Sequence, residues 1–205
     1  MCIQYTKSMQ VLVPGSGRPY LDGDSLDMAA PLVFTVAGVM GAAECQEAIA
    51  RTEQIGFDAA PITTAAGFVM RPDIRNNERV MFDDVALAAE LFGRIRGALP
   101  GRLSGRRPVG VNERFRCYRY EPGQRFAPHY DGAYERSGTE RSELTFMVYL
   151  NDGFTGGQTA FHDFDVEVAP RPGLALLFQH RLLHEGCAVR SGVKYVLRSD
   201  VMYAE

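Results

Sequence analysis

The feature that most limits the fold of this chain is a change in the pattern of residue types after Pro108. From there on, short runs rich in β-branched and aromatic residues alternate with glycine- and proline-containing turns such as Pro122-Gly123 and Gly156-Gly157. The runs are 115–120, 144–150, 174–178 and 195–202. Many short strands joined by such turns are typical of a β-sandwich or a barrel. We therefore predict a β-rich second half.

Two segments before Pro108 have helical spacing instead. Apolar positions recur every three or four residues over 43–55, and Gly56 follows as a stop signal. A second helix is predicted over 85–98, with Asp83 or Asp84 as its N-terminal cap. Helices packed against one sheet of a jelly roll satisfy this order of elements.

The domain organisation follows from these patterns. Residues 1–30 contain turn-forming stretches and read as turns or a loosely ordered leader, and 31–36 read as a short strand. We expect a single domain over residues 31–205, with a helical layer at about 43–100 and a β-rich core at about 108–205.

Composition excludes several classes of protein. Hydrophobic residues make up 46% of the chain and charged residues 23%, as in globular proteins. The net charge of −3 argues against a partner bound through a nucleic-acid backbone. No apolar run reaches the length of a membrane span, and no secretory signal is recognisable at the N-terminus. The four cysteines are scattered without a CxxC pair, so we expect a cytoplasmic protein without disulfides.

A candidate metal site lies in the β-rich half, at His129-Tyr130-Asp131. In an extended chain, residues i and i+2 face the same side about 7 Å apart, so His129 and Asp131 can converge on one ion. His184 can supply a third ligand. Two histidines and one carboxylate form the facial triad of non-haem Fe(II) sites, whereas zinc sites more often use cysteine or a third histidine. An HxD motif alone is a weak signal, because His129 could equally be a surface or core histidine.

The surrounding motifs strengthen this interpretation. Residues 118–203 resemble the prolyl 4-hydroxylase-like branch of the 2-oxoglutarate/Fe(II)-dependent oxygenase superfamily. The matching segments, in the expected order, are 120–124, 129–131, 150–152, 156–161, 172–178, 184–186 and 192–195. Gln158 departs from the family pattern, which usually has glutamate there in its GGET motif. Since that position is not a metal ligand, the class is unaffected.

The resemblance implies a fold and a chemistry. The fold is α+β but mainly β, a double-stranded β-helix (jelly roll) core with the N-terminal helices packed on one sheet. The metal ligands are His129, Asp131 and His184. The cofactors are Fe(II), the co-substrate 2-oxoglutarate and O2, with ascorbate as a further candidate. The reaction is hydroxylation of a C–H bond, with release of succinate and CO2.

The resemblance also implies how 2-oxoglutarate binds. Its far carboxylate meets a basic residue on a late strand, and Lys194 lies at the family spacing, ten positions after His184. Arg198 is the alternative: both side chains share one face of the strand, but about 13 Å separates them, so only one is expected to reach the co-substrate. Otherwise Arg198 is a rim residue or a partner of the site. Tyr120 matches a phenol that hydrogen-bonds 2-oxoglutarate, or is simply a packed strand tyrosine. Thr159 matches a threonine near the co-substrate.

The substrate contacts are the least determined part of the site. The polar stretch 71–79 is either a solvated loop or a lid, and the loop after Asp131 borders the site in the family. The candidate contacts are Arg75, Asn76, Asn77, Tyr134 and Arg136. His180 could replace His184 as a ligand in a helix, but 174–178 reads as a strand, and we expect His180 at the pocket edge or on the surface.

Several functions remain open at this level. A prolyl residue of a peptide, a free amino acid or another small molecule could each be the substrate. The rivals are a non-catalytic metal-binding protein on this fold, a zinc or manganese cupin-like enzyme, and a nucleic-acid demethylase. The acidic pI of about 5.8 counts against the last. The sequence leaves the oligomeric state open.

Overall fold

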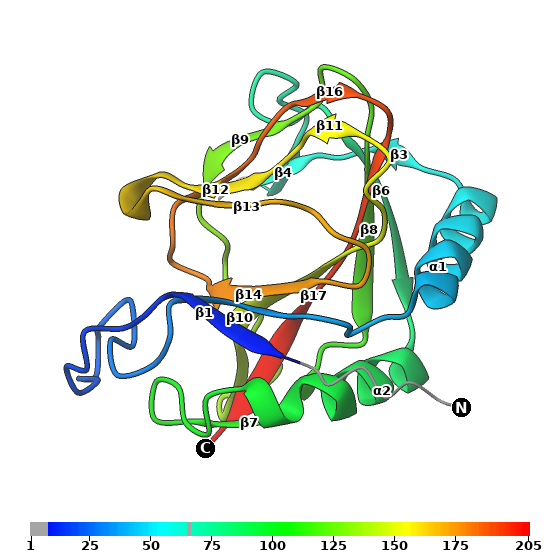
Figure 1. The fold of residues 1–205 in the computed structure, drawn as a ribbon. Coiled ribbons are helices and arrows are strands. Elements are labelled where there is room, and N and C mark those ends of the chain that lie inside the picture. Colours follow the sequence, from blue (N-terminus) through cyan, green and yellow to red (C-terminus); the bar gives the residue numbers. More distant parts are fainter. Residues whose placement is uncertain (1–7, 65–66) are drawn as a thin grey trace.

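The computed structural model describes residues 8–64 and 67–205, which form two facing antiparallel sheets with two helices on the outside of the larger one (Figure 1). In the described residues, the larger sheet has nine strands in the order β1-β2-β14-β10-β17-β8-β6-β3, with β7 paired to β17. These strands are β1 (Met9–Val13), β2 (Val33–Val36), β3 (Asp58–Ala59), β6 (Glu78–Asp83), β7 (Arg107–Val111), β8 (Arg114–Tyr120), β10 (Glu140–Tyr149), β14 (Ala175–Gln179) and β17 (Lys194–Ala204).

The smaller sheet covers the open side of the roll and has the order β13-β12-β15-β9. Its strands are β9 (Phe126–His129), β12 (Thr159–Phe161), β13 (Val166–Val168) and β15 (His184–Gly186). There are also two two-stranded sheets among the described residues: β4 (Ile62–Thr64) pairs with β5 (Gly67–Val69), and β11 (Thr155–Gly156) pairs with β16 (Val189–Ser191). The 3₁₀ helix η2 (His162–Phe164) connects β12 to β13. This arrangement confirms the predicted mainly β, jelly-roll fold class.

The central strand β17 explains how the site is positioned. Both of its faces are covered, so most of its residues are buried, including the polar Lys194, Ser199 and Asp200. Leu197 and Val201 pack in the core between the larger sheet and the helices, whereas Val196 packs in the core between the two sheets. Because alternate side chains point to opposite faces, Lys194 and Arg198 share the inner face with Val196.

The two helices lie where the sequence predicts them. α1 (Ala42–Ile55) ends at Gly56, whose φ of 92° suits glycine, and α2 (Val85–Ile95) continues into the 3₁₀ helix η1 (Arg96–Ala98). Asp84 caps α2, because its side chain accepts a hydrogen bond from the backbone N–H of Leu87 at 3.0 Å. The buried face of α2, including Leu91 and Ile95, packs on the outer face of the larger sheet.

Two predicted regions differ from the structure. The helical layer expected over 43–100 is interrupted by strands, of which β6 pairs along its whole length with β8. The described part of the predicted leader, residues 8–30, contains β1, which pairs with β2, and Asp27, whose N–H donates to Gln179. The sequence patterns did not predict β6 and β1, because the stability of these two strands depends on distant partner strands and not on a local pattern of residues. Residues 1–7 of the leader lie outside the described residues.

Two further properties concern the whole described chain. None of the helices in residues 8–64 and 67–205 combines the length and apolar character needed to cross a membrane. The described cysteines, Cys45, Cys117 and Cys187, are free thiols. Cys2 lies outside the described residues.

Candidate metal centre and co-substrate pocket

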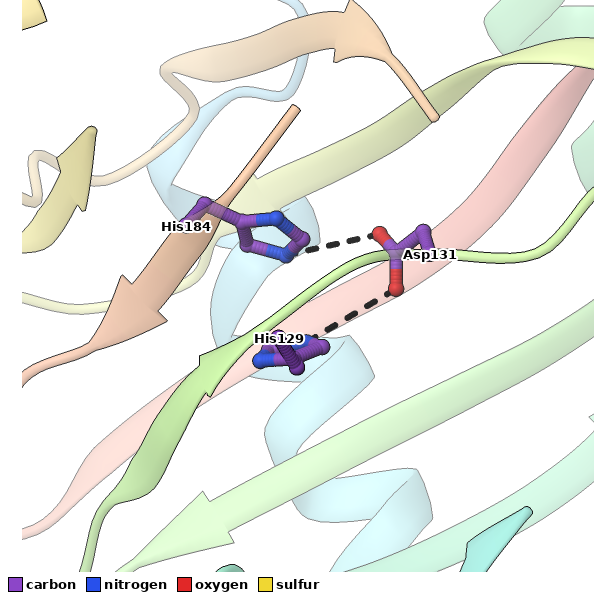
Figure 2. Close-up of side chains that lie close together, drawn as sticks. All are labelled: His129, Asp131 and His184. Carbon is purple, nitrogen blue, oxygen red and sulfur yellow. Dashed lines mark ion pairs between the residues drawn. The ribbon is translucent and has the colours of Figure 1, made fainter. Parts of the chain in front are cut away.

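Two strands of the smaller sheet bring the three predicted metal ligands together. β9 ends at His129, and Asp131 follows two residues later. β15 begins at His184, which lies opposite His129 in the pairing of these strands. The three side chains point toward one another (Figure 2), with one ligand atom of each within 4.8 Å of the others. Asp131 Oδ1 is 3.7 Å from His129 Nε2, and Asp131 Oδ2 is 3.5 Å from His184 Nε2.

Backbone carbonyls fix the orientation of both imidazoles. The Nδ1 atom of His129 hydrogen-bonds Ala127 O at 2.8 Å, and that of His184 hydrogen-bonds Leu182 O at 2.9 Å. A carbonyl can only accept, so Nδ1 carries the proton and Nε2 keeps its lone pair toward the centre. Burial lowers the pKa of His129 to about 3 and also lowers the pKa of His184. Both rings are therefore neutral, as metal ligands must be.

Asp131 is held by a cation and a hydroxyl. Arg198 Nη2 lies 2.9 Å from Oδ1, and Thr145 Oγ1 donates to Oδ2 at 2.6 Å. Burial acts to raise the pKa of this carboxyl, but Arg198, followed by His184 and His129, outweighs burial and holds the pKa well below its usual range. Asp131 is therefore a charged ligand in a fixed rotamer.

A chain of hydrogen bonds extends behind Asp131 and includes His180. His180 Nδ1 is 3.1 Å from Thr145 Oγ1, and His180 Nε2 is 2.8 Å from Ser142 Oγ. Ser142 Oγ in turn accepts the backbone N–H of Tyr134 at 2.8 Å. His180 is only 4% exposed, so its predicted place at the pocket edge or surface was wrong. The ring fills the core because its two nitrogens are satisfied by these hydroxyls.

The donor set fits an iron(II) ion. Within residues 8–64 and 67–205, these three side chains form the group of histidine, cysteine and acidic residues close enough to share a metal. Two neutral imidazoles and one carboxylate, without a thiolate, are the ligands of non-haem Fe(II) centres that keep coordination positions open. The carbonyl and hydroxyl partners described above supply the orientation that such ligands need.

A cavity opens beside these ligands, and Lys194 also lines it. Lys194 is 2% exposed; its ammonium donates to Gly157 O at 2.6 Å and lies 5.0 Å from the ring centre of Tyr120. No carboxylate of the described residues lies within ion-pair distance of it, and burial lowers its pKa to about 8. Thr159, whose hydroxyl accepts from Tyr149 at 2.7 Å, also lines this cavity. A buried cation without a counter-ion indicates a site for an anionic ligand.

The two basic residues of β17 occupy different positions. Arg198 is engaged with Asp131 at the metal ligands, whereas the Lys194 ammonium lies near the rings of Tyr120 and Tyr149. This placement favours Lys194 as the partner of the far carboxylate and Arg198 as a support of Asp131, the second of the two roles considered for it.

The predicted substrate contacts divide into two groups. Arg75 and Tyr134 line a wider outer cleft, which meets the co-substrate cavity at the metal ligands His129 and Asp131. The other three do not line it. Arg136 pairs with two surface glutamates, Asn76 hydrogen-bonds the backbone of a neighbouring loop, and Asn77 accepts from Arg75 Nε at 2.8 Å. Asn77 therefore orients Arg75 instead of meeting the cleft.

Sequence reasoning missed three residues that support the ligands. Thr145 and His180 hold Asp131, and the ring of Phe126 stacks on His129 with centroids 3.5 Å apart. Thr145 carried a usable signal: a hydroxyl on the apolar strand β10 needs a hydrogen-bond partner when buried. His180 and Phe126 carried none, because their contacts join segments far apart in the sequence.

Comparisons with known proteins agree with this site. Residues 115–199 match the model of the 2OG-Fe(II) oxygenase superfamily. The chain is 25% identical over 192 residues to prolyl 4-hydroxylase 1 of Arabidopsis thaliana, covering 80% of this chain and 66% of that protein. A mimivirus relative is 30% identical over 108 residues, covering 43% and 44%. The chain thus spans less than two thirds of the length of both relatives.

Two solved structures share the fold. The viral collagen prolyl hydroxylase of Paramecium bursaria Chlorella virus-1, in complex with 2-oxoglutarate, has a TM-score of 0.59 at 23% identity, covering 85% of this chain and 97% of that one. A prolyl hydroxylase from Trichoplax adhaerens, in complex with a hypoxia-inducible-factor peptide fragment, has a TM-score of 0.61 at 19% identity, covering 82% of each chain.

Residues 115–199 resemble the 2-oxoglutarate/Fe(II) oxygenase superfamily, and the fold and the donor set agree with that resemblance. The relatives are prolyl 4-hydroxylases by name, which confirms the predicted resemblance to that branch. The family uses Fe(II), 2-oxoglutarate and O2, as expected.

Proposed function

We propose that this protein is a 2-oxoglutarate- and O2-dependent hydroxylase that oxidises a C–H bond of its substrate and releases succinate and CO2. The observation that carries the proposal is the pairing of two features in one cavity. One is the His129–Asp131–His184 donor set, and the other is the buried Lys194, with no acidic partner in the described chain. The match of residues 115–199 to the superfamily model supports the same conclusion.

The ligands and their supports keep the metal site in shape. His129 and His184 present neutral Nε2 atoms, and Asp131 presents a carboxylate oriented by Arg198 and Thr145. When bound, Fe(II) supplies the activation of O2 that is coupled to decarboxylation of 2-oxoglutarate. A metal held by only these three side chains would keep coordination positions open for the co-substrate and O2.

The cavity residues bind and orient 2-oxoglutarate. The Lys194 ammonium forms a charge-assisted pair with the far carboxylate of 2-oxoglutarate. In doing so, the ammonium exchanges its hydrogen bond to Gly157 O for a bond to a charged, stronger acceptor. The Tyr120 phenol and the Thr159 hydroxyl line the same cavity and can hydrogen-bond that carboxylate. Phe178 packs against His184 with ring centres 4.4 Å apart and helps to keep water from the ligands.

The substrate is a prolyl residue of a peptide, a free amino acid or another small molecule. Support for a peptide comes from the relatives, which are prolyl 4-hydroxylases by name, and from the Trichoplax structure with its peptide fragment. The outer cleft that meets the metal ligands has room for such a group. A role for ascorbate and a cytoplasmic location stay predictions.

The proposal is tested by measuring succinate formation in air with Fe(II), 2-oxoglutarate and a panel of prolyl peptides and free amino acids. Wild-type protein is expected to form succinate in an Fe(II)-dependent manner, and His184→Ala is expected to form none. Arg171→Gln, which removes a charge from an exposed turn, serves as the matched control. Wild-type protein that forms no more succinate than His184→Ala with every compound would contradict the proposal.

A further inference from the structure

The outer cleft gathers arginines around the metal end of the co-substrate cavity. Its lining includes five of them, Arg75, Arg79, Arg116, Arg181 and Arg198, and two acidic residues, Asp131 and Asp200. The rest of the lining is mainly aromatic, aliphatic or small. The whole chain has a net charge of −3, so positive charge is concentrated in this cleft.

Strand pairing explains the concentration. β17, β8 and β6 are adjacent, and their register places Arg198 opposite Arg116 and Tyr118 opposite Arg79. Arg75 approaches from the segment before β6, with its guanidinium 4.5 Å from the ring centre of Tyr118. Burial by itself would raise the pKa of Tyr118, yet Arg198, Arg75 and Arg116 together lower it. The positive charges of several guanidinium groups are therefore close together around Tyr118 in the outer cleft.

Three of these arginines, Arg75, Arg79 and Arg181, lack an acidic partner in the described chain. Arg181 is exposed to solvent, whereas Arg75 and Arg79 are buried or half-buried. Elsewhere on the molecule, arginines such as Arg51, Arg114 and Arg119 form ion pairs with aspartate or glutamate. Neither Arg75 nor Arg79 lies within ion-pair distance of a carboxylate of the described residues, and residues 1–7 and 65–66 contain no Asp or Glu.

Arg75 is the more informative of the two because it is only 5% exposed. Its Nε donates to Asn77, and its guanidinium lies between the rings of Tyr118 and Phe126, at 4.5 and 4.4 Å from their centres. Its Nη2 atom is buried and has no hydrogen-bond partner in the described chain. A buried charged donor without a partner is costly, and the surrounding contacts fix its position before any ligand arrives.

Arg79 adds a second positive charge nearby. It is half-buried and stacks 5.7 Å from the ring centre of Phe68. Burial lowers its pKa, and the charges of Arg75 and Arg116 lower it further, although a guanidinium remains protonated at any physiological pH. An anion bound between Arg75 and Arg79 would relieve this repulsion.

We propose that the substrate of this oxygenase carries a carboxylate that binds Arg75 and Arg79 in the outer cleft. Arg75 lies close to the metal ligand His129, because the ring of Phe126 contacts both side chains. A carboxylate held there brings neighbouring C–H bonds of the same molecule to the metal centre. A carboxylate matches the donors better than a phosphate, because Arg75 has one unused Nη edge and Asp131 and Asp200 limit the positive charge. The inference rests on the proposed function and narrows its substrate class.

The test compares matched acids and amides. Protein loaded with Fe(II) and saturating 2-oxoglutarate under anaerobic conditions is titrated calorimetrically with N-acetylproline and N-acetylprolinamide, and with the peptides acetyl-Pro-Glu-amide and acetyl-Pro-Gln-amide. The first pair represents a small-molecule carboxylate and the second an acidic side chain of a peptide. In at least one pair, the acid is expected to bind about tenfold or more tightly than the amide.

Substitutions in the outer cleft test whether its arginines cause the tighter binding of the acids. Arg75→Gln should remove it, and Arg79→Gln, at a half-buried position, should reduce it without the folding risk of a buried substitution. Arg171→Gln, in an exposed turn outside the cleft, should leave it unchanged. The same samples show whether the Fe(II)–2-oxoglutarate complex has formed, by its visible absorption.

The outcomes are distinct. Equal binding of acid and amide, no binding of either acid at about 10 mM, or an unchanged preference in both cleft variants would overturn the carboxylate inference alone, provided the absorption is present. Tighter binding of O-phosphoserine or of a short oligothymidylate than of either acid would also overturn it. Absence of the absorption in wild-type protein would remove the proposed function as well.

Discussion

Replacing Lys194 by methionine should have opposite effects on stability and on co-substrate binding. The ammonium is 2% exposed with no acidic partner in the described chain, and burial lowers its pKa from 10.5 to about 8. At 1.36 kcal/mol per pKa unit, holding this charge in the folded protein at pH 7 costs about 3 kcal/mol. Methionine removes that cost but also the hydrogen bond to Gly157 O, which offsets about 1 kcal/mol.

The expected net gain in the free energy of unfolding is about 2 kcal/mol at pH 7, or a rise in Tm of about 4–8 °C for a chain of this size. The folded pKa lies below the unfolded value, so the wild-type cost is complete below pH 8 and disappears as the pH rises toward 10.5. The advantage of Lys194→Met should therefore shrink between pH 8 and 10.5. Urea unfolding of metal-free protein across this range measures it.

Binding of 2-oxoglutarate should change in the other direction. Removing one partner of a buried charge pair costs about 2–5 kcal/mol, so the Kd of the Fe(II)-loaded variant should rise about 30-fold or more. Anaerobic calorimetry gives this value, with Arg171→Met as the surface control. A variant that is less stable than wild type at pH 7, or that binds 2-oxoglutarate with unchanged Kd, would refute this account of Lys194.

Three further predictions follow from the supports of the site and of α2. Arg198→Met should change the Kd of 2-oxoglutarate by less than about tenfold, because this arginine forms an ion pair with Asp131. A larger effect than that of Lys194→Met would instead assign Arg198 to the far carboxylate of 2-oxoglutarate. Thr145→Val removes the hydroxyl that orients the carboxylate of Asp131, and metal affinity measured by competition with a chelator should fall about 10- to 100-fold; unchanged affinity would show that this hydroxyl is dispensable. Asp84→Ala should lower the free energy of unfolding by about 1 kcal/mol through loss of the α2 cap. Asp83→Ala removes an exposed acid that does not cap the helix, and an equal loss in both variants would contradict the capping argument.

Local pattern was sufficient where an element is recognisable by itself. The stripe of α2 with its cap at Asp84, and strands β8, β10, β14 and β17, follow from periodicity and turn residues. β6 was missed, since the polar residues at its start, Glu78 and Arg79, resemble a loop. They become a strand only because β8, more than 30 positions later, offers backbone partners.

The candidate site shows the same division. His129, Asp131 and His184 were recognisable because ligand type and motif order restrict them strongly. Roles that depend on packing were not. Arg136 was expected to contact the substrate, but surface glutamates hold it away from the cleft. His180 resembles an ordinary polar residue in sequence, and its place behind Asp131 is set by the meeting of β10 with the segment after β14.

The central claim is that His129, Asp131, His184 and Lys194 together hold Fe(II) and 2-oxoglutarate in one cavity. The most direct test is anaerobic titration of Fe(II) into metal-free protein with 2-oxoglutarate present, followed by visible spectroscopy. The account predicts a weak metal-to-ligand charge-transfer band that requires both components, is absent from His129→Ala and Asp131→Ala, and needs more 2-oxoglutarate in Lys194→Met. Tight uptake of the metal by wild-type protein without any such band would contradict it and would indicate a metal-binding protein with a different chemistry.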